Sequence, residues 1–356
     1  MNALLASLLV AIGALVASSA ASSAHQIESR AQRLVAARAL PPHVAGRFRE
    51  LANLQEGPDG SYYAFDRRSH TVHRIDAAWT SATLIVDIGQ KPGEILQPSA
   101  FDSAGEMFAV SDAPFGMDRI QVFFRDATAM GAFQPQVRSL PRITMGSTVM
   151  NGAGSLELTR DSVLLSEPDT GWLVSEYGLD GKPLRHFGRL RSTGHENDND
   201  VHIGLNTGIP VAAGDGAVWF VFQAGVPMLR KYNRAGELIF ERHIEGVELD
   251  PVIRVLPSRW PRKRTGGVDR ELPLIIPNVQ AAAVAPDGSL WIGLSLPYVY
   301  VFDAAGDKTR VVSLHGAGMI RATSLAFSRK GRLIVTPGGY EFDVPAKNRA
   351  APGMTP

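Results

Sequence analysis

A turn followed by an apolar strand recurs six times along the chain. The copies are PDGSYYAFD (58–66), DSAGEMFAVSD (102–112), TRDSVLLSEPD (159–169), AGDGAVWFVF (213–222), APDGSLWIGLS (285–295) and SRKGRLIVTPG (328–338). Asp-Gly and related pairs supply the positive φ of a tight hairpin turn, so each copy marks two antiparallel strands that meet. In five of the six units a second apolar strand and a short closing strand follow. A β-sandwich of irregular hairpins does not explain this recurrence. We therefore predict an all-β fold, a six-bladed β-propeller of four-stranded blades.

One unit carries a motif as well as the rhythm. Residues 96–133 have a proline before the first strand, a D-x-x-G turn, a strand that ends in Asp, the run R-I-Q-V-F, and a closing Gly and Phe. These positions are Pro98, Asp102, Gly105, Asp112, Arg119, Ile120, Gln121, Val122, Phe123, Gly131 and Phe133. The stretch resembles an NHL repeat, and most of residues 50–340 is similar in rhythm to NHL-like or TolB-like six-bladed propellers. The resemblance implies the fold and leaves function open, because such propellers include lyases, lactonases, sensor domains, RNA binders and interaction modules.

The N-terminus predicts export. Residues 3–16 carry no charge and are followed by the small-residue run ASSAASSA. A stretch of this length is short for a membrane span of about 20 residues and suits the apolar core of a signal peptide. Ser22 and Ala24 fit cleavage before His25. We expect a signal peptide over 1–24, a periplasmic or secreted protein, and no membrane span after cleavage. Since the leader lacks Lys and Arg, an uncleaved anchor is the alternative.

The chain ends raise the question of how the ring closes. Residues 28–40 (ESRAQRLVAARAL) predict a short helix that Pro41 and Pro42 stop, within a helical lead-in over 25–42. The propeller is expected over 43–345 and a disordered tail over 346–356. No fourth strand follows residues 340–344 in the last unit. We therefore predict that the extended stretch 43–49 (HVAGRFR) is the outer strand of the last blade.

Composition removes several function classes. The chain has no cysteine, which excludes disulfides, thiolate metal sites and a cysteine nucleophile. Its 36 basic and 35 acidic side chains leave a formal charge of +1, so no overall field attracts nucleic acid. Neither a G-x-S-x-G elbow nor an H-E-x-x-H motif is present. Enzymes whose sites are scattered among blades remain open.

Two long loops between units carry unusual side chains. With the loop at 138–152, the loops at 189–208 and 246–278 should stand on one rim of a propeller. The first of these two reads HENDNDVH, and its candidate ligands for Ca²⁺ or Zn²⁺ are His195, Glu196, Asp198, Asp200 and His202. The alternative is a solvated loop.

The loop at 246–278 gathers cations beside a tryptophan. Its members are Arg259, Trp260, Arg262, Lys263, Arg264 and Arg270. Such a cluster suits an anionic ligand or an acidic protein patch. The alternative is an exposed basic loop that is partly offset by the acids at 195–200.

Residues that end the second strand of a unit form the last candidate set. They are Asp66, Asp112, Glu167, Gln223 and Ser295. Near a channel mouth, converging polar groups could bind a small molecule. The resemblance adds that lactonase-like propellers hold a metal with carboxylates and amides at this place. The structural alternative is that each Asp bonds its own turn.

Together these features predict an exported, monomeric propeller that binds a small polar or anionic ligand, or a protein partner, through its loop-rich rim. Nucleic acid is not expected as a partner. The alternative is a metal-assisted lyase or lactonase-type enzyme with its site at the channel mouth.

Overall fold

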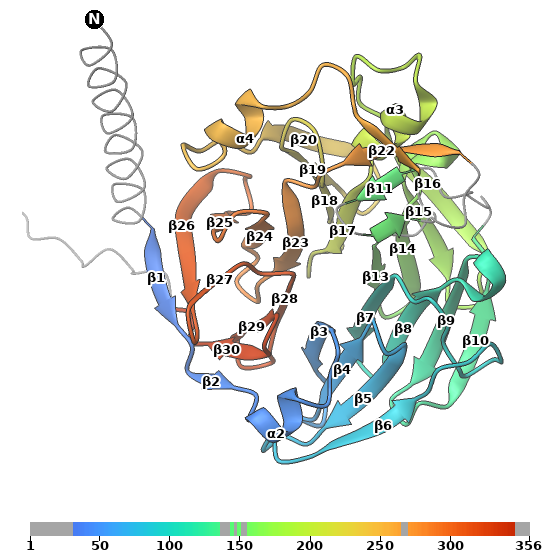
Figure 1. Cartoon of the computed structure of the whole chain (residues 1–356), viewed down its shortest axis with the longest axis vertical. Helices are drawn as coiled ribbons and strands as arrows, with labels where there is room; N and C mark the ends of the chain where they lie inside the picture. The colour runs from blue at the N-terminus through green and yellow to red at the C-terminus, as the bar shows by residue number, and fades with distance from the viewer. Residues whose placement is uncertain (1–30, 136–142, 146–147, 151–154, 265–269, 346–356) are drawn as a thin grey trace, which may run out of the picture.

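Six antiparallel sheets follow one another along the chain and surround a central opening (Figure 1). The computed structural model describes residues 31–135, 143–145, 148–150, 155–264 and 270–345. Sheet 1 contains β3 (Leu51–Glu56), β4 (Tyr62–Asp66), β5 (Thr71–Ile75) and β6 (Ala82–Val86). Sheet 2 contains β7 (Ala100–Ala104), β8 (Met107–Asp112), β9 (Arg119–Phe124) and β10 (Ala129–Phe133). Sheet 3 contains β13 (Leu156–Leu158), β14 (Ser162–Ser166), β15 (Trp172–Gly178) and β16 (Pro183–Arg189).

The second half of the chain repeats this plan. Sheet 4 contains β17 (Gly208–Ala212), β18 (Val218–Phe222), β19 (Met228–Tyr232) and β20 (Leu238–His243). Sheet 5 contains β23 (Val279–Val284), β24 (Leu290–Leu294), β25 (Val299–Phe302) and β26 (Lys308–His315), with β27 (Met319–Ile320) on β26. Sheet 6 contains β28 (Ser324–Phe327), β29 (Leu333–Thr336) and β30 (Tyr340–Phe342). Each predicted turn–strand copy thus supplies the second strand of one sheet. The arrangement is that of a β-propeller.

Apolar side chains hold neighbouring sheets together. Each of six buried clusters draws its members from two adjacent sheets. In the cluster between sheets 1 and 2, the Phe65 and Phe101 rings stack with centroids 5.5 Å apart. In the cluster between sheets 6 and 1, Ile334 packs with Leu54. The core is therefore a series of interfaces between sheets, and no sheet buries its apolar faces alone.

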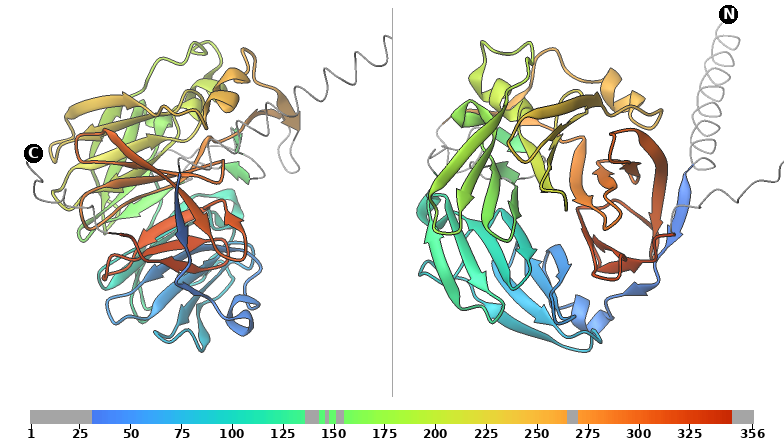
Figure 2. Two further views of the ribbon diagram at one scale, coloured as in Figure 1. Left: turned by 90° about the vertical axis from the view of Figure 1, so that its left-hand side faces the viewer. Right: turned by 180° about the vertical axis from the view of Figure 1, so that it is seen from behind.

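The N-terminal segment differs from both predictions made for it. Its described part contains β1 (Gln32–Val35), which pairs in parallel with β26, and β2 (Arg38–Ala39), which pairs with β30. Figure 2 shows β1 alongside β26 from behind as well. The predicted helix at 28–40 is thus wrong over its described part. Helix propensity is outweighed here because Leu34 is buried in the cluster between sheets 5 and 6.

The predicted outer strand at 43–49 is also wrong. The short helix α2 (Pro42–Ala45) begins there, with Pro42 in its first turn, where a missing N–H costs nothing. Val44 of this helix is fully buried in the cluster between sheets 6 and 1. The outer strand of sheet 6 is β2 instead, a few residues earlier in the chain.

Three long connections meet on one rim, as the topology predicts. Residues from two of them form a rim sheet of β11 (Ile143–Met145), β12 (Thr148–Met150), β21 (Arg262–Arg264) and β22 (Glu271–Ile275), in which β11 and β22 are parallel. The third supplies α3 (Asn199–Leu205), which lies against this sheet (Figure 1). Short helices also occur at α4 (Asp250–Arg254), Pro114–Gly116 and Pro168–Thr170.

Some predictions fall outside the described residues, among them the signal peptide at 1–24 and the tail at 346–356. Over the described ranges, the structure has no helix long and apolar enough to cross a membrane.

Candidate functional site

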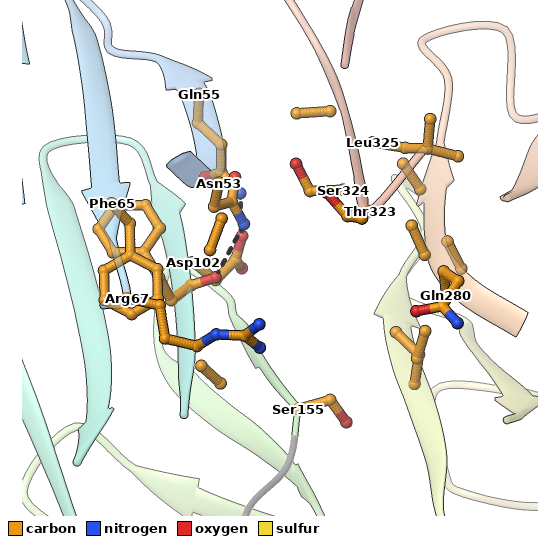
Figure 3. Close-up of a pocket in the computed structure, with 18 of the residues that line it drawn as sticks. Asn53, Gln55, Phe65, Arg67, Asp102, Ser155, Gln280, Thr323, Ser324 and Leu325 are labelled. Atoms are coloured by element: carbon orange, nitrogen blue, oxygen red, sulfur yellow. Dashed lines mark hydrogen bonds between the residues drawn. The ribbon is translucent and has the colours of Figure 1, made fainter. Parts of the chain in front are cut away.

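A cavity of about 1040 Å³ fills the centre of the ring. The innermost strand of every sheet contributes to its wall: β3, β7, β13, β17, β23 and β28. Polar side chains, among them Asn53, Gln55, Gln280 and Thr323, project into it beside apolar ones such as Leu325 (Figure 3). A cavity of this size accommodates a drug-sized ligand.

Polar side chains on the inner strands join the first four sheets in sequence. Gln55 donates to Asp102 Oδ1 (2.8 Å), Asp102 Oδ2 accepts from the Leu158 N–H (2.7 Å), and Glu157 Oε1 accepts from the Ala212 N–H (2.8 Å). The backbone groups of these inner strands would otherwise face the channel unpaired. The two carboxyl groups therefore stabilise the ring as well as lining its cavity.

Asp102 and Glu157 titrate abnormally. Burial raises the pKa of Asp102 to about 6, against hydrogen bonds from Gln55 and the Leu158 amide that lower it. Burial also raises the pKa of Glu157 well above its usual range, and the negative charge of Asp102 raises it further. The charge of one carboxyl group disfavours the charge of the other, so the pair retains a proton to higher pH than an isolated carboxyl group does.

Two amide side chains face the cavity unpaired. The Gln280 amide points into it (Figure 3), and within the described part of the chain that amide has no hydrogen-bond partner. Gln223 also lines the cavity, and its Oε1 atom accepts no hydrogen bond from the described residues. Free amide groups from two adjacent sheets are suited to a polar ligand.

Arginine side chains surround the loop-rich end of the cavity. Arg49, Arg67 and Arg321 line it there, on connections that belong to sheets 1 and 6. Arg67 forms an ion pair with Glu50. The carboxyl groups of Asp102 and Glu157 lie further along the inner strands. The cavity is therefore lined by arginines at its loop-rich end and by carboxyl groups further along the channel.

Two of the predicted strand-end residues, Asp66 and Asp112, bond the backbone. Asp66 is fully buried and accepts hydrogen bonds from the Arg49 N–H (2.7 Å) and the Glu50 N–H (3.0 Å). Asp112 repeats this pattern by accepting from the Leu96 N–H (3.0 Å), and it also binds Arg119. Neither carboxylate lines the cavity.

The other three strand-end candidates differ in whether they line the cavity. Glu167 is buried and accepts from the Tyr177 hydroxyl (2.8 Å), away from the cavity, and burial raises its pKa. Gln223 and Ser295 line the cavity. The structure therefore brings together two members of the predicted set of five.

The loop at 195–202 is bound to the basic loop. Asp198 Oδ1 and Oδ2 both lie 2.8 Å from the Arg262 Nη2 atom, and Asp200 lies 3.3 Å from Arg270. Glu196 accepts from the Ser192 hydroxyl and the Thr193 amide. His202 Nδ1 lies 2.8 Å from the Thr193 hydroxyl, and His195 contributes to no metal cluster.

These contacts show how the candidate ligands are placed without an ion, and the cation site stays a prediction. The described residues contain no group of three His, Asp or Glu side chains placed to hold a metal ion. Two of the predicted ligands lie against guanidinium groups instead, which is the alternative of an offset basic loop.

Trp260 packs the basic loop against α3 and the rim sheet. Its side chain is buried in a cluster with Val201 and Leu205 of α3 and Ile275 of the rim sheet. Arg259 and Arg264 beside it are exposed. They could still meet an anionic partner, but they do not line the cavity.

Sequence analysis missed the inner-strand residues Asn53, Gln55, Glu157 and Gln280, and assigned Asp102 to a turn. The available signal was weak: polar residues mix with apolar ones before only some of the predicted turns, as in Leu51–Glu56. Such a pattern marks a strand with one wet face but does not say that the wet face is a channel.

Comparisons with known proteins leave the family open. No family model matches the chain, and no curated protein matches it in sequence. Among solved structures, the hydrazine synthase of Kuenenia stuttgartiensis is 12% identical with a TM-score of 0.47, over 80% of this chain and 92% of that one. Virginiamycin B lyase from Staphylococcus aureus is 10% identical with a TM-score of 0.46, over 81% of this chain and 80% of that one. Its catalytically inactive variant with Quinupristin is likewise 10% identical, with a TM-score of 0.47, over 80% and 76% of the two chains. At these scores the likeness carries no argument about function.

Proposed function

We propose that the chain is a six-bladed, NHL-like or TolB-like propeller, closed by its N-terminal segment and exported by a signal peptide over 1–24. The six clusters between adjacent sheets support the blade number. The pairing of β2 with β30 supports the closure. The uncharged run before residue 17 supports export to the periplasm or the medium.

The propeller binds a small polar ligand in its central cavity. The observation that carries this proposal is the unpaired Gln280 amide, which projects into a space lined by all six inner strands. Gln280 is half-buried and its amide has free donor and acceptor groups, so a bound ligand that pairs with them gains affinity and orientation.

Binding is favoured over catalysis by what the cavity carboxyl groups already do. Asp102 and Glu157 accept backbone hydrogen bonds that join sheets, so they are committed to holding the ring. The described lining contains no histidine to act as an acid or base near neutral pH. A lyase or lactonase-type enzyme at the channel mouth is the alternative, and turnover of a bound ligand would establish it.

The test uses a substitution that fills the cavity. Ala282 lines the wall on the same side of β23 as Gln280, so Ala282→Trp should occupy ligand space. Purified protein is screened by thermal shift against sugars, sugar acids, amino acids and nucleosides. We expect some of these to raise the melting temperature of the natural chain but not of Ala282→Trp.

Ala235→Trp, on an exposed hairpin at the opposite face, is the matched control and should respond like the natural chain. A library without effect on the natural chain would contradict the proposal. So would an equal response in Ala282→Trp.

A protein partner on the same rim is the second candidate. Exposed large apolar side chains occur on connections at the loop-rich end, and examples are Phe115, Val255 and Ile276. A photocrosslinker at Phe115 should therefore capture one defined partner, and capture should fail with Ile276→Ser or with the crosslinker at Ala235.

A further inference from the structure

We propose that the ligand is a hydroxylated monocarboxylate, and that Arg49 and Arg321 bind its carboxylate at the loop-rich end of the cavity. The inference rests on the proposed binding function and adds the chemical class of the ligand. It starts from two guanidinium groups that line the cavity. Among the residues that the structure describes, neither group has an ion pair or a hydrogen bond.

The side chains of both arginines are exposed, and the backbone at or beside each is anchored. The Arg49 N–H donates to the buried Asp66 carboxylate (2.7 Å). Arg321 precedes the buried Ala322, and the N–H of Thr323 donates to the Thr336 carbonyl (2.8 Å). Their sheets are adjacent, because the Thr336 hydroxyl donates to the carbonyl of Ala52 in β3 (3.2 Å). The two cations thus stand on neighbouring, rigid elements at one side of the mouth.

The nearby acids do not cancel this charge. Glu50 is the lining carboxylate at this end, and it is paired with Arg67. Asp66 is also close by, but its carboxylate accepts from backbone amides, so within the described residues Arg49 and Arg321 keep guanidinium groups without an ion pair. Guanidinium groups bind carboxylates and phosphates through paired N–H donors, so the free groups select an anion.

The rest of the lining limits that anion to one charge and calls for hydroxyl groups. Asp102 and Glu157 lie in the same cavity, and their shared negative charge repels a second anionic group. The unpaired Gln223 Oε1 atom needs a donor, and the Gln280 amide offers both a donor and an acceptor. A hydroxyl group can satisfy each of them. The ligand is therefore oriented, with its carboxylate at the mouth and its hydroxyl groups further in.

The experiment compares charged and neutral forms of the same molecules. Isothermal titration at pH 7 measures the binding of gluconate, glucuronate and galacturonate, of their neutral amides, and of inorganic phosphate. We expect at least one carboxylate to bind about ten times more tightly than its amide, and phosphate to bind more weakly than that carboxylate. The double variant Arg49→Gln/Arg321→Gln should lose the preference and still bind the amide.

Arg68→Gln is the matched control, because Arg68 is an exposed arginine close in sequence that does not line the cavity. It should keep the preference. Equal binding of acid and amide, a preference that survives the double variant, or tightest binding of phosphate would overturn the charge assignment and leave the cavity as a binding site. If no acid or amide binds, this inference fails; if the broader ligand screen is also silent, the proposed function fails with it.

Discussion

Buried carboxylates at the ends of second strands fix the chain where it enters the next inner strand. Asp66 and Asp112 each accept from an amide 16 residues earlier, at Glu50 and Leu96. Burial alone would raise the pKa of Asp66, but hydrogen bonds from the Arg49, Ser69 and Glu50 amides outweigh it, and the pKa is lowered. The charged form is thus the one that the fold stabilises.

Asp66→Ala should cost about 3 kcal/mol of unfolding free energy, because three part-buried N–H donors lose their acceptor. Urea denaturation measures the loss. Asp215→Ala is the control, since Asp215 is exposed and accepts one amide in a hairpin turn, and it should cost less than about 1 kcal/mol. Equal losses would show that the Asp66 contacts are not structural.

Glu157→Gln should reduce the pH dependence of stability. A carboxyl group whose pKa is higher in the folded chain contributes stability at acid pH, and this is lost as pH rises through its folded pKa. Burial and the charge of Asp102 raise the pKa of Glu157, so the natural chain should lose stability from pH 5 to pH 8. Gln keeps an acceptor for the Ala212 amide and removes the charge.

Urea denaturation at both pH values measures the difference. Glu237→Gln, at an exposed hairpin carboxylate, should lose as much stability as the natural chain. A loss of the same size in Glu157→Gln would refute the shared-proton picture of the cavity acids.

At the scale of elements, the segment that contains the two short N-terminal strands joins sheet 6 to sheet 1. β2 covers the outer edge of sheet 6, and Arg38 lies over the Trp79 ring of sheet 1 at 4.0 Å. Leu40, just after β2, is buried in the cluster between sheets 6 and 1. An uncovered edge strand would also offer free backbone groups for aggregation.

A chain that begins at Pro41 should therefore be less stable than one that begins at Ala36 by at least about 3 kcal/mol, the usual cost of losing a buried leucine. It should also aggregate faster on warming. Urea denaturation and light scattering measure the two effects. Indistinguishable curves would mean that β2 does not close sheet 6 in solution.

The ion pair between α3 and the rim sheet should contribute modestly. Asp198 is also the N-cap of α3, so Asp198→Asn keeps the cap and removes the charge. With Arg262→Gln it completes a double-mutant cycle, for which we expect a coupling of about 0.5 to 1 kcal/mol, because both side chains are partly exposed. A coupling of zero would leave the apolar contacts of Trp260 as the tie between the loops.

Sequence patterns predicted the elements whose causes are local. Asp-Gly turns marked the hairpins, and each marked strand is present. The N-terminal strands could not be predicted this way, because Leu34 pairs with Leu314 and nothing near residue 34 signals that partner. The cavity residues were missed for a related reason. Whether Gln280 faces a channel or solvent depends on the other five sheets, which its neighbouring residues do not reveal. The sequence around Asp66 likewise does not show whether that residue lies in a channel or bonds its local backbone.

At the scale of the whole molecule, stability should be shared by all sheets. Ile334 is fully buried and joins sheet 6 to sheet 1. Ile334→Ala should cost about 3 kcal/mol. Because each sheet depends on two neighbours, hydrogen exchange should accelerate in sheets 3 and 4 as well, although they lie across the ring.

Exchange measured by mass spectrometry tests this directly. Leu184→Ala, at an exposed position of β16, should have little effect on any sheet. Acceleration confined to sheets 6 and 1 would show that the interfaces open independently.

The position of β1 and β2 also sets the order in which a newly made chain can finish folding. These strands are the first described elements to leave the ribosome, and their partners, β26 and β30, are among the last. Gln32 and Arg310, which approach each other at this seam, are 278 positions apart. Early sheets can pair as they emerge, but the strands of the first segment have no partners until sheets 5 and 6 have been synthesised. Completion is thus tied to the synthesis of these two sheets, and a chain truncated before sheet 6 leaves β2 without a partner.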